Sequence, residues 1–250
     1  MLKTIRLNDN CSTTGCALVL GGFDGLHLGH SRLIARAKSQ GVPIGIMTIV
    51  GVKGNVLFTL EENFAPVAYV CGTDFRFGKG AAGDADSVAK MSKVPVLKEE
   101  LVLFGGEKVA TRKLKDLLAE GKVDEMALML GAPFFATGVV VEGRKIGRII
   151  GFPTANIDYA AGKLPLKEGV YIVSAEAKGK TYKGIANFGT QPTFGKMQVR
   201  LEVHLDGFEG DLYGDTLKVE FYCYLRPIKK FGDMEELRTQ LNEDIQKVRE

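Results

Sequence analysis

The chain has 250 residues, of which 33 are basic and 30 are acidic, and its net charge is only +3. So small and scattered an excess argues against nucleic acid as a partner, but anionic small molecules remain open as ligands. No apolar run approaches the roughly 18 residues of a membrane span, and the N-terminal residues turn polar where a signal peptide needs an apolar core. The four cysteines have no paired spacing, which is typical of reduced thiols. We expect a cytoplasmic protein without membrane contact, and its oligomeric state stays open.

Segments typical of strands and helices alternate in the first half of the chain. Residues 16–23 form a short apolar run that ends in glycines, which predicts a buried strand, and residues 30–41 have helical spacing of apolar side chains. Further strands are predicted at 42–50 and 65–72, and another helix at 111–121. Because strand, helix and strand in succession form a parallel sheet with crossover helices, the pattern predicts an α/β domain.

The pattern changes after a short predicted helix within residues 123–134. The segments that follow are short, rich in β-branched and aromatic residues, and separated by turns that contain glycine, with a hairpin tip at 177–182. This pattern is typical of an antiparallel barrel or sandwich. An amphipathic helix is predicted at 233–250. We place the domain boundary between residues 121 and 122, which gives domains of residues 1–121 and 122–250.

A glycine-rich turn with two histidines, G-G-F-D-G-L-H-L-G-H, joins the first predicted strand and helix at residues 21–30. Ligands of parallel sheets bind at the carboxyl ends of strands, where a helix amino terminus also offers N–H groups to phosphates. His27 and His30 can face the same anion and stabilise charge that develops on an α-phosphate during nucleotidyl transfer. A plain helix cap is the alternative, but two of the three histidines in one turn favour a site. Other expected phosphate-binding residues of this turn are Gly22, Phe23, Asp24 and Gly29.

Three glycines recur every four residues ahead of a proline, at Gly143, Gly147 and Gly151. This spacing occurs in packed helices, but the β-branched neighbours and Pro153 argue against a helix. We therefore predict a loop that wraps closely around nucleotide phosphates. It is not a Walker A loop, because the G-K-[ST] ending is missing. The arginines expected to pair with the phosphates are Arg144 and Arg148.

Two oxygen-bearing side chains follow this loop, at Thr154 and Asn156. A hydroxyl and an amide carbonyl are hard, neutral ligands that suit Mg²⁺, which keeps its other positions for phosphates and water. If this segment is extended, residues two apart point to the same side. The pair therefore predicts a Mg²⁺ site, and the alternative is that both residues only form a turn.

A strand with a polar face is predicted at residues 199–207, where apolar and polar side chains alternate. Glu202 lies on the polar face and can accept a proton from a substrate hydroxyl. The alternative is an ordinary solvated strand residue. On the residues alone, Asp206 and Glu220 are equal rivals for the role of the catalytic base.

Together these motifs resemble the bifunctional bacterial riboflavin kinase/FAD synthetase family. The resemblance is carried by G-F-D-G-L-H-L-G-H, G-F-P-T-A-N, G-I-A-N-F-G-T-Q-P-T-F-G, L-E-V-H and L-R-P-I-K-K-F. It implies a Rossmann-like α/β nucleotidyltransferase domain followed by an all-β, six-stranded Greek-key barrel with a terminal helix. The implied enzyme phosphorylates riboflavin to FMN and adenylylates FMN to FAD, with ATP as co-substrate.

The resemblance also implies roles for single residues. Thr154 and Asn156 would hold Mg²⁺ with ATP, and Glu202 would be the base for the ribityl 5′-hydroxyl. The segment G-T-D-F-R-F-G-K-G, residues 72–80, matches another motif of the family. It places Asp74 and Phe75 near the flavin or the nucleotide. Aromatic residues that could stack on the flavin ring are Phe188, Phe194 and Tyr213.

The first domain departs from the family pattern. A T-F-D-P-H-P segment is replaced by T-I-V-G-V-K at 48–53, and some tens of residues before the D-F-R-F-G motif are missing. The S-S-T-x-I-R motif survives as A-T-R-K-L-K, in which Thr111 keeps a hydroxyl and Lys115 replaces the arginine without its bidentate fork. We expect a riboflavin kinase that also makes FAD. The alternatives are a kinase alone, a non-catalytic flavin or nucleotide binder, and a nucleotidyltransferase for another substrate.

Overall fold

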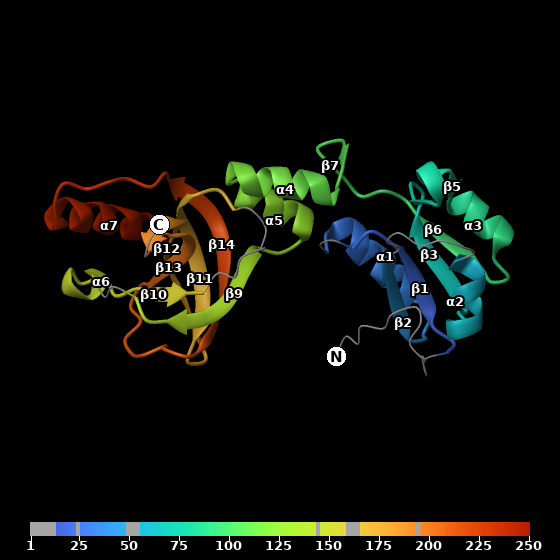
Figure 1. Cartoon of the computed structure of the whole chain (residues 1–250), viewed down its shortest axis with the longest axis horizontal. Coiled ribbons are helices and arrows are strands. Elements are labelled where there is room, and N and C mark those ends of the chain that lie inside the picture. The colour runs from blue at the N-terminus through green and yellow to red at the C-terminus, as the bar shows by residue number, and fades with distance from the viewer. Residues whose placement is uncertain (1–13, 24–25, 49–55, 144–145, 159–165, 194–195) are drawn as a thin grey trace. The chain divides into compact units, whose positions relative to one another are not determined.

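The computed structural model describes residues 14–23, 26–48, 56–143, 146–158, 166–193 and 196–250 (Figure 1). The chain divides into two compact units, residues 1–111 and 112–250, and each is described by itself. The predicted boundary lies further along the chain, after residue 121. The predicted helix at 111–121 falls almost entirely in the second unit, where the Lys167 N–H donates to the Leu118 carbonyl at 3.1 Å.

The first unit contains a parallel sheet of four strands in the order β2-β1-β3-β6, which confirms the predicted α/β domain. The strands are β1 (Ala17–Gly21), β2 (Ile44–Thr48), β3 (Ala68–Gly72) and β6 (Val96–Glu99). The helices are α1 (Leu28–Lys38), α2 (Val56–Phe64) and α3 (Ala85–Met91). Smaller elements are β4 (Arg76–Phe77), a 3₁₀ turn (Lys79–Ala81), β5 (Gly83–Asp84), β7 (Leu103–Phe104) and β8 (Glu107–Lys108).

Helices cover both faces of this sheet. Ala17 and Val19 of β1 pack with Leu33 of α1 on one face. Their neighbours Leu18 and Leu20 pack on the other face in a cluster that includes α2 and α3. Because both faces are buried, the strand reads as a continuous apolar run rather than as an alternating one.

The second unit is built on a closed antiparallel barrel of six strands in the order β10-β13-β12-β11-β14-β9, as predicted. The strands are β9 (Phe134–Val141), β10 (Ala155–Ile157), β11 (Gly169–Ala177), β12 (Lys180–Thr193), β13 (Lys196–Leu205) and β14 (Thr216–Arg226). The helices are α4 (Thr111–Glu120), α5 (Val123–Leu130), α6 (Ile146–Ile149) and α7 (Met234–Arg249).

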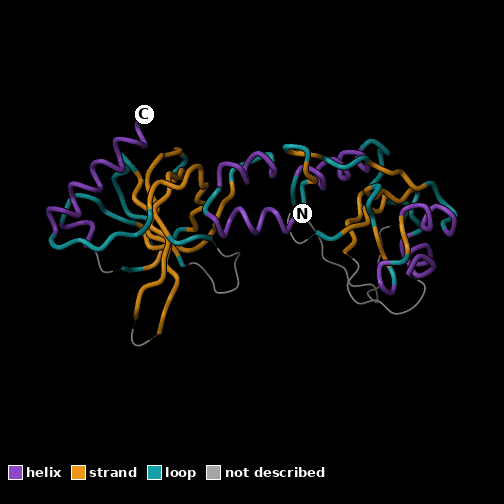
Figure 2. Tube along the Cα trace, turned by 90° about the horizontal axis from the view of Figure 1, so that it is seen from above, coloured by secondary structure: helices purple, strands orange, loops and turns teal. Residues whose placement is uncertain are grey.

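Alternation along the barrel strands separates its interior from an outer face that α7 covers. Tyr171, Ala186 and Val203 are almost completely buried inside the barrel. The outward side chains Val170 and Ile185 pack with Ile245 and Val248 of α7. Figure 2 shows the C-terminal helix running along the outside of the barrel strands. This packing shelters part of the outer barrel face from water.

The glycine-rich segment before Pro153 contains one turn of helix, α6, where we predicted a loop without helix. That prediction was wrong for these four residues. The turn ends before Gly151, whose φ is +84°, so Pro153 never enters the helix and causes no clash. None of the helices in the described part of the chain has both the length and the apolar character that crossing a bilayer requires.

Candidate active sites

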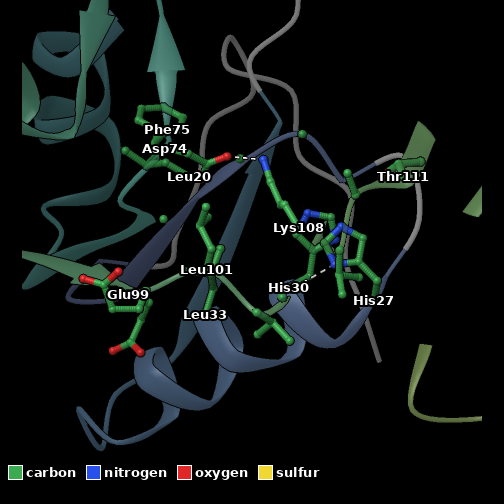
Figure 3. A pocket seen from close by; sticks show the side chains of 18 of the residues that line it. Leu20, His27, His30, Leu33, Asp74, Phe75, Glu99, Leu101, Lys108 and Thr111 are labelled. Atoms are coloured by element: carbon green, nitrogen blue, oxygen red, sulfur yellow. Dashed lines mark hydrogen bonds and ion pairs between the residues drawn. The ribbon is translucent and has the colours of Figure 1, made fainter. Parts of the chain in front are cut away.

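A cavity of about 380 Å³ lies at the carboxyl ends of β1, β3 and β6 in the first unit (Figure 3). This is the edge at which parallel sheets bind their ligands. The cavity brings together residues of three separate segments. Those named by the sequence analysis are Gly22, His27, Gly29, His30, Asp74, Phe75 and Thr111.

His27 is both a helix cap and a lining residue of this cavity. Its Nδ1 accepts the His30 backbone N–H at 3.4 Å, and the two imidazoles stack with centroids 3.8 Å apart. Burial, followed by the charges of His30 and Lys108, lowers the pKa of His27 to about 4, so its ring is neutral at pH 7. Because Nδ1 accepts, the proton lies on Nε2 and can be donated to a ligand.

Gly29 packs closely against His27. A Cβ at this position would lie 3.1 Å from two atoms of the imidazole, which is closer than ordinary side-chain contact. Phe23 contacts the His30 ring at 4.6 Å between centroids. The glycine and the aromatic ring therefore hold the two histidines in place.

Lys108 is a cation of this cavity that the sequence analysis missed. Its ammonium group forms an ion pair with Asp74, and Figure 3 shows its side chain beside His27 and His30. Lys115, which the sequence analysis chose as the replacement for the family's arginine, lies on α4 in the second unit. Nothing in the sequence distinguishes Lys108 from its many neighbours of the same charge, because its place depends on the β7–β8 hairpin.

A second cavity, of about 350 Å³, lies between the outer barrel face and α7. Glu202 of β13 lies directly opposite Asn156 of β10 on one side and Asn187 of β12 on the other. Directly opposed residues share one face of a sheet, so these three side chains line the same cavity. Glu202 is the only carboxylate among the described residues that line it.

Thr154 and Asn156 both line the second cavity, as expected for residues two apart in an extended segment. Oδ1 of Asn156 is buried and has no hydrogen-bond partner among the described residues. A buried acceptor without a partner is costly, and a divalent cation would satisfy it. No cluster of three or more His, Cys, Asp or Glu side chains exists in the described part of the chain. The Thr154 hydroxyl and Oδ1 of Asn156 are neutral oxygens, and the Glu202 carboxylate lies in the same cavity; oxygen donors of these kinds fit Mg²⁺.

His204 anchors the segment that precedes Thr154. Its Nδ1 lies 2.8 Å from the Pro153 carbonyl oxygen, and because a carbonyl only accepts, this nitrogen carries the proton. The ring also packs against Phe152 with centroids 5.1 Å apart. The histidine of the L-E-V-H motif is thus a positioning residue that the sequence analysis did not single out.

A third cavity, of about 600 Å³, lies on the other face of the same strands. Ala155, Val203 and Leu205 line it, whereas their neighbours Asn156, Glu202 and His204 line the second cavity. Thr154 lines both. The two cavities therefore meet at the predicted metal-binding segment. Phe208, Tyr213 and Arg148 also line the third cavity.

The rivals of Glu202 are held in surface ion pairs. Asp206 accepts from Nε of Arg249 at 2.7 Å, and this hydrogen bond lowers the pKa of the carboxyl. Glu220 accepts from Lys218 at 2.6 Å and from the Tyr222 hydroxyl at 3.2 Å. Neither is among the described residues that line the three cavities.

The structure does not bring all of the predicted phosphate-binding glycines and flavin-binding residues into one site. A Cβ at Gly143 would collide with the Asn156 amide, and one at Gly147 with the Phe152 carbonyl oxygen, so close packing requires both glycines. Phe188 is buried in the barrel, and Tyr213 lies in the third cavity, away from the cavity that holds Glu202. Three predicted residues lie outside the described part of the chain: Asp24, Arg144 and Phe194.

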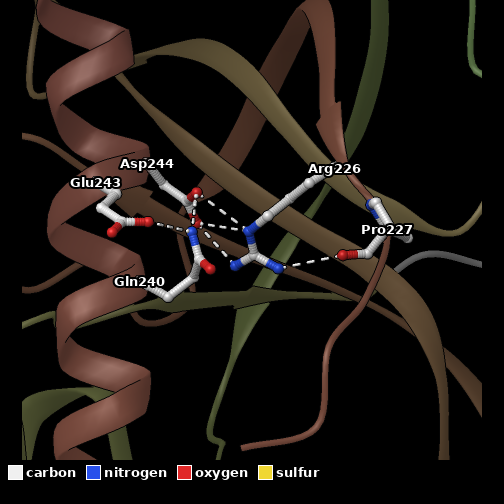
Figure 4. Close-up of polar contacts among 5 residues, drawn as sticks. All are labelled: Arg226, Pro227, Gln240, Glu243 and Asp244. Carbon is white, nitrogen blue, oxygen red and sulfur yellow. Dashed lines mark hydrogen bonds and ion pairs between the residues drawn. The ribbon is translucent and has the colours of Figure 1, made fainter.

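A buried ion pair fixes α7 over the second cavity (Figure 4). Asp244 is fully buried and accepts from Nε and Nη2 of Arg226 at 3.0 Å and 2.7 Å. Arg226 also donates to the Pro227 carbonyl at 3.1 Å and lines the cavity. The pair was not predicted, because Asp244 looks like one more polar residue of an amphipathic helix.

Replacing Asp244 with asparagine should destabilise the second unit by about 3 kcal/mol, since the guanidinium of Arg226, whose side chain is 16% exposed, would lose its charged partner. In thermal unfolding of the full chain, the melting temperature should fall by roughly 5–10 °C. The control is Glu243→Gln, at an exposed neighbour on the same helix, and it should change stability by less than about 1 kcal/mol. Equal melting temperatures for the two variants would contradict a stabilising role for the pair.

Comparisons with known proteins cover nearly the whole chain. A family model described as riboflavin kinase matches residues 130–250, and one described as FAD synthetase matches residues 9–52. A bifunctional riboflavin kinase/FMN adenylyltransferase from Pseudomonas fluorescens is 30% identical over 94% of this chain and 92% of its own length. The protein of the same name from Bacillus subtilis (strain 168) is 30% identical over 92% of this chain and 90% of its own length.

A solved structure shares the fold. The crystal structure of a macrolide-efflux protein from Streptococcus pneumoniae matches with a TM-score of 0.84 over 97% of this chain and 96% of that chain. The two sequences are 24% identical, so this likeness supports the fold alone.

Proposed function

Because the chain belongs to the family of bifunctional riboflavin kinases/FMN adenylyltransferases, we propose that its second unit phosphorylates riboflavin to FMN and that its first unit adenylylates FMN to FAD. The observation that carries the kinase proposal is the meeting of two cavities at Thr154, with Glu202 in one of them. Both reactions consume ATP. We propose the cytoplasm, which supplies ATP, as their compartment.

Riboflavin occupies the second cavity, because the base must reach its terminal alcohol. ATP occupies the third cavity, where Phe208 and Tyr213 offer aromatic surfaces and Arg148 a cation for phosphates. Glu202 orients the ribityl 5′-hydroxyl and takes its proton while the oxygen attacks the γ-phosphorus in line. The new O–P bond forms as the bond to the bridging oxygen breaks, and ADP leaves.

A divalent cation, Mg²⁺ in our proposal, is held by the Thr154 hydroxyl and by Oδ1 of Asn156. When bound, it neutralises charge on the ATP phosphates. The support for this role is the buried acceptor of Asn156 without a partner among the described residues. Gly143 leaves room for this amide, and His204 fixes the backbone just before Thr154.

In the first unit, the FMN phosphate attacks the α-phosphorus of ATP, and pyrophosphate leaves. Nε2–H of the neutral His27, together with His30, donates hydrogen bonds to the α-phosphate as negative charge grows on it. Lys108 lies in the same cavity and supplies a positive charge for the phosphates once they displace Asp74 from it. Lys108 therefore has the phosphate-binding role that the sequence analysis gave to Lys115.

Replacing Lys108 with alanine should raise the KM for ATP in FAD formation about tenfold, since a charged hydrogen bond to phosphate contributes about 1.5–3 kcal/mol. FMN formation from riboflavin should not change. The matched control, Lys115→Ala, should leave both reactions near the wild-type rate. Steady-state assays that follow FAD and FMN separately compare the wild-type protein with the two variants. If Lys115→Ala raises the KM for ATP in FAD formation and Lys108→Ala does not, the assignment of Lys108 is wrong.

Chromatographic assays of the purified chain test the proposed function itself. Riboflavin with ATP and Mg²⁺ should give FMN, and FMN with ATP should give FAD. FMN without FAD would indicate a kinase alone, and bound flavin without ATP consumption would indicate a binding protein. Absence of FAD in an assay that consumes ATP with another phosphorylated acceptor would favour a different nucleotidyltransferase.

A further inference from the structure

Asn187 of β12 has a buried side-chain acceptor that no part of the mechanism above uses. It lines the second cavity beside Glu202, and its Oδ1 has no hydrogen-bond partner among the described residues. A buried acceptor left unpaired costs about 1–3 kcal/mol. Its position inside a ligand cavity indicates that a bound molecule supplies the missing donor.

The metal is not the partner of Asn187, because the two asparagines of the cavity lie on strands that β13 separates. Glu202 lies between them, and neighbouring strands are about 4.8 Å apart, so their backbones are about 10 Å apart. The Asn156 amide packs against Gly143 next to β9, on the side of β10 away from Asn187. Two ligands of one Mg²⁺ lie within about 4 Å of each other, which this arrangement does not favour.

The environment of Asn187 matches a chain of alcohol groups. Its neighbours in the same cavity include two apolar residues, Val170, its direct partner on β11, and Ile185, two residues before it on β12. Glu202 is its direct partner on β13. A substrate whose terminal hydroxyl reaches Glu202 from the side of β12 brings the adjoining part of its chain alongside Asn187. An alcohol hydroxyl there can donate to Oδ1.

We propose that Asn187 accepts a hydrogen bond from a secondary hydroxyl of the flavin side chain, and that this bond makes the kinase select flavins with a sugar-alcohol chain. The proposal rests on the function proposed for the second unit. A site with a buried acceptor discriminates against a ligand that lacks the matching hydroxyl, because the acceptor then stays unpaired. Asn187 is thus a specificity-determining residue, distinct in role from Glu202.

The test measures flavin binding by fluorescence titration with two probes, riboflavin and lumiflavin, in which a methyl group replaces the sugar-alcohol chain. Asn187→Leu keeps a similar volume and removes the acceptor, whereas Asn187→Ser keeps a side-chain oxygen. We expect Asn187→Leu to weaken riboflavin binding about tenfold and to leave lumiflavin binding unchanged. Asn187→Ser should recover part of the loss, and Asn242→Ala on the exposed face of α7 should behave as wild type.

Steady-state kinetics add a second readout. In Asn187→Leu the KM for riboflavin should rise about tenfold, while the KM for ATP and the Mg²⁺ dependence stay unchanged. An unchanged KM for ATP also shows that the barrel of the variant is folded. Equal weakening of both flavins, no weakening of either, or an altered Mg²⁺ dependence would each overturn the assignment. A wild-type chain that binds no riboflavin would instead contradict the proposed function of the second unit.

Discussion

Replacing Glu202 with glutamine should lower the rate of riboflavin phosphorylation by about 10²–10⁴-fold, the usual contribution of a general base. Glutamine keeps the shape of the side chain but cannot accept the proton of the ribityl hydroxyl. ATP binding should be retained, because the nucleotide lies on the other face of the strand in our account. The measurement is the single-turnover rate of FMN formation, with ATP affinity determined separately.

Glu220→Gln is the matched control for this substitution. Glu220 is also a strand glutamate of the barrel, but it pairs with Lys218 and Tyr222 and lies outside the described lining of the cavities. The Glu220→Gln substitution should leave the rate of phosphorylation within about twofold of the wild-type rate, as is usual for surface positions. Near-normal turnover in Glu202→Gln would remove Glu202 from the role of the base.

Replacing His30 with alanine should abolish FAD formation, by a factor of at least about 10², while FMN formation continues at the wild-type rate. A donor aimed at charge that develops in the transition state commonly contributes this much. His30 lines the cavity of the first unit and stacks on His27, so its removal also disturbs the second donor. Separate assays of the two reactions on one preparation give the result.

His204→Ala is the reciprocal control, because His204 is the histidine that holds Pro153 in the second unit. It should slow FMN formation and leave the conversion of FMN to FAD unchanged. If His30→Ala lowers both reactions equally, its effect is on folding and not on adenylyl transfer.

The fold could be predicted from the spacing of apolar residues in two cases. One is a strand with one apolar and one polar face, and the other is a strand with both faces buried. The alternation around Glu202 predicted the face of β13 correctly, and the apolar run at β1 predicted a strand covered on both sides. The helices α2 and α3 were not predicted, because at nine and seven residues they are too short to show a clear helical period. The first motif was found at the predicted edge of the sheet, since the carboxyl end of β1 leads directly into α1.

The residues that the sequence analysis missed depend on register and on contacts between distant segments. Asn187 becomes meaningful only once it lies opposite Glu202, and Asp244 only once it meets Arg226 across eighteen residues of chain. Lys108 reaches the histidines because a short hairpin turns it into the cavity. Such pairings are set by strand order and packing, which local spacing does not encode.

A crystal structure of the full chain with Mg²⁺, ADP and riboflavin tests the central claim most directly. We predict that the metal contacts the Thr154 hydroxyl and Oδ1 of Asn156, with the nucleotide on the inner face of β13. The ribityl 5′-hydroxyl should lie within hydrogen-bond distance of Glu202. A metal bound elsewhere, or a flavin remote from Glu202, would contradict the account.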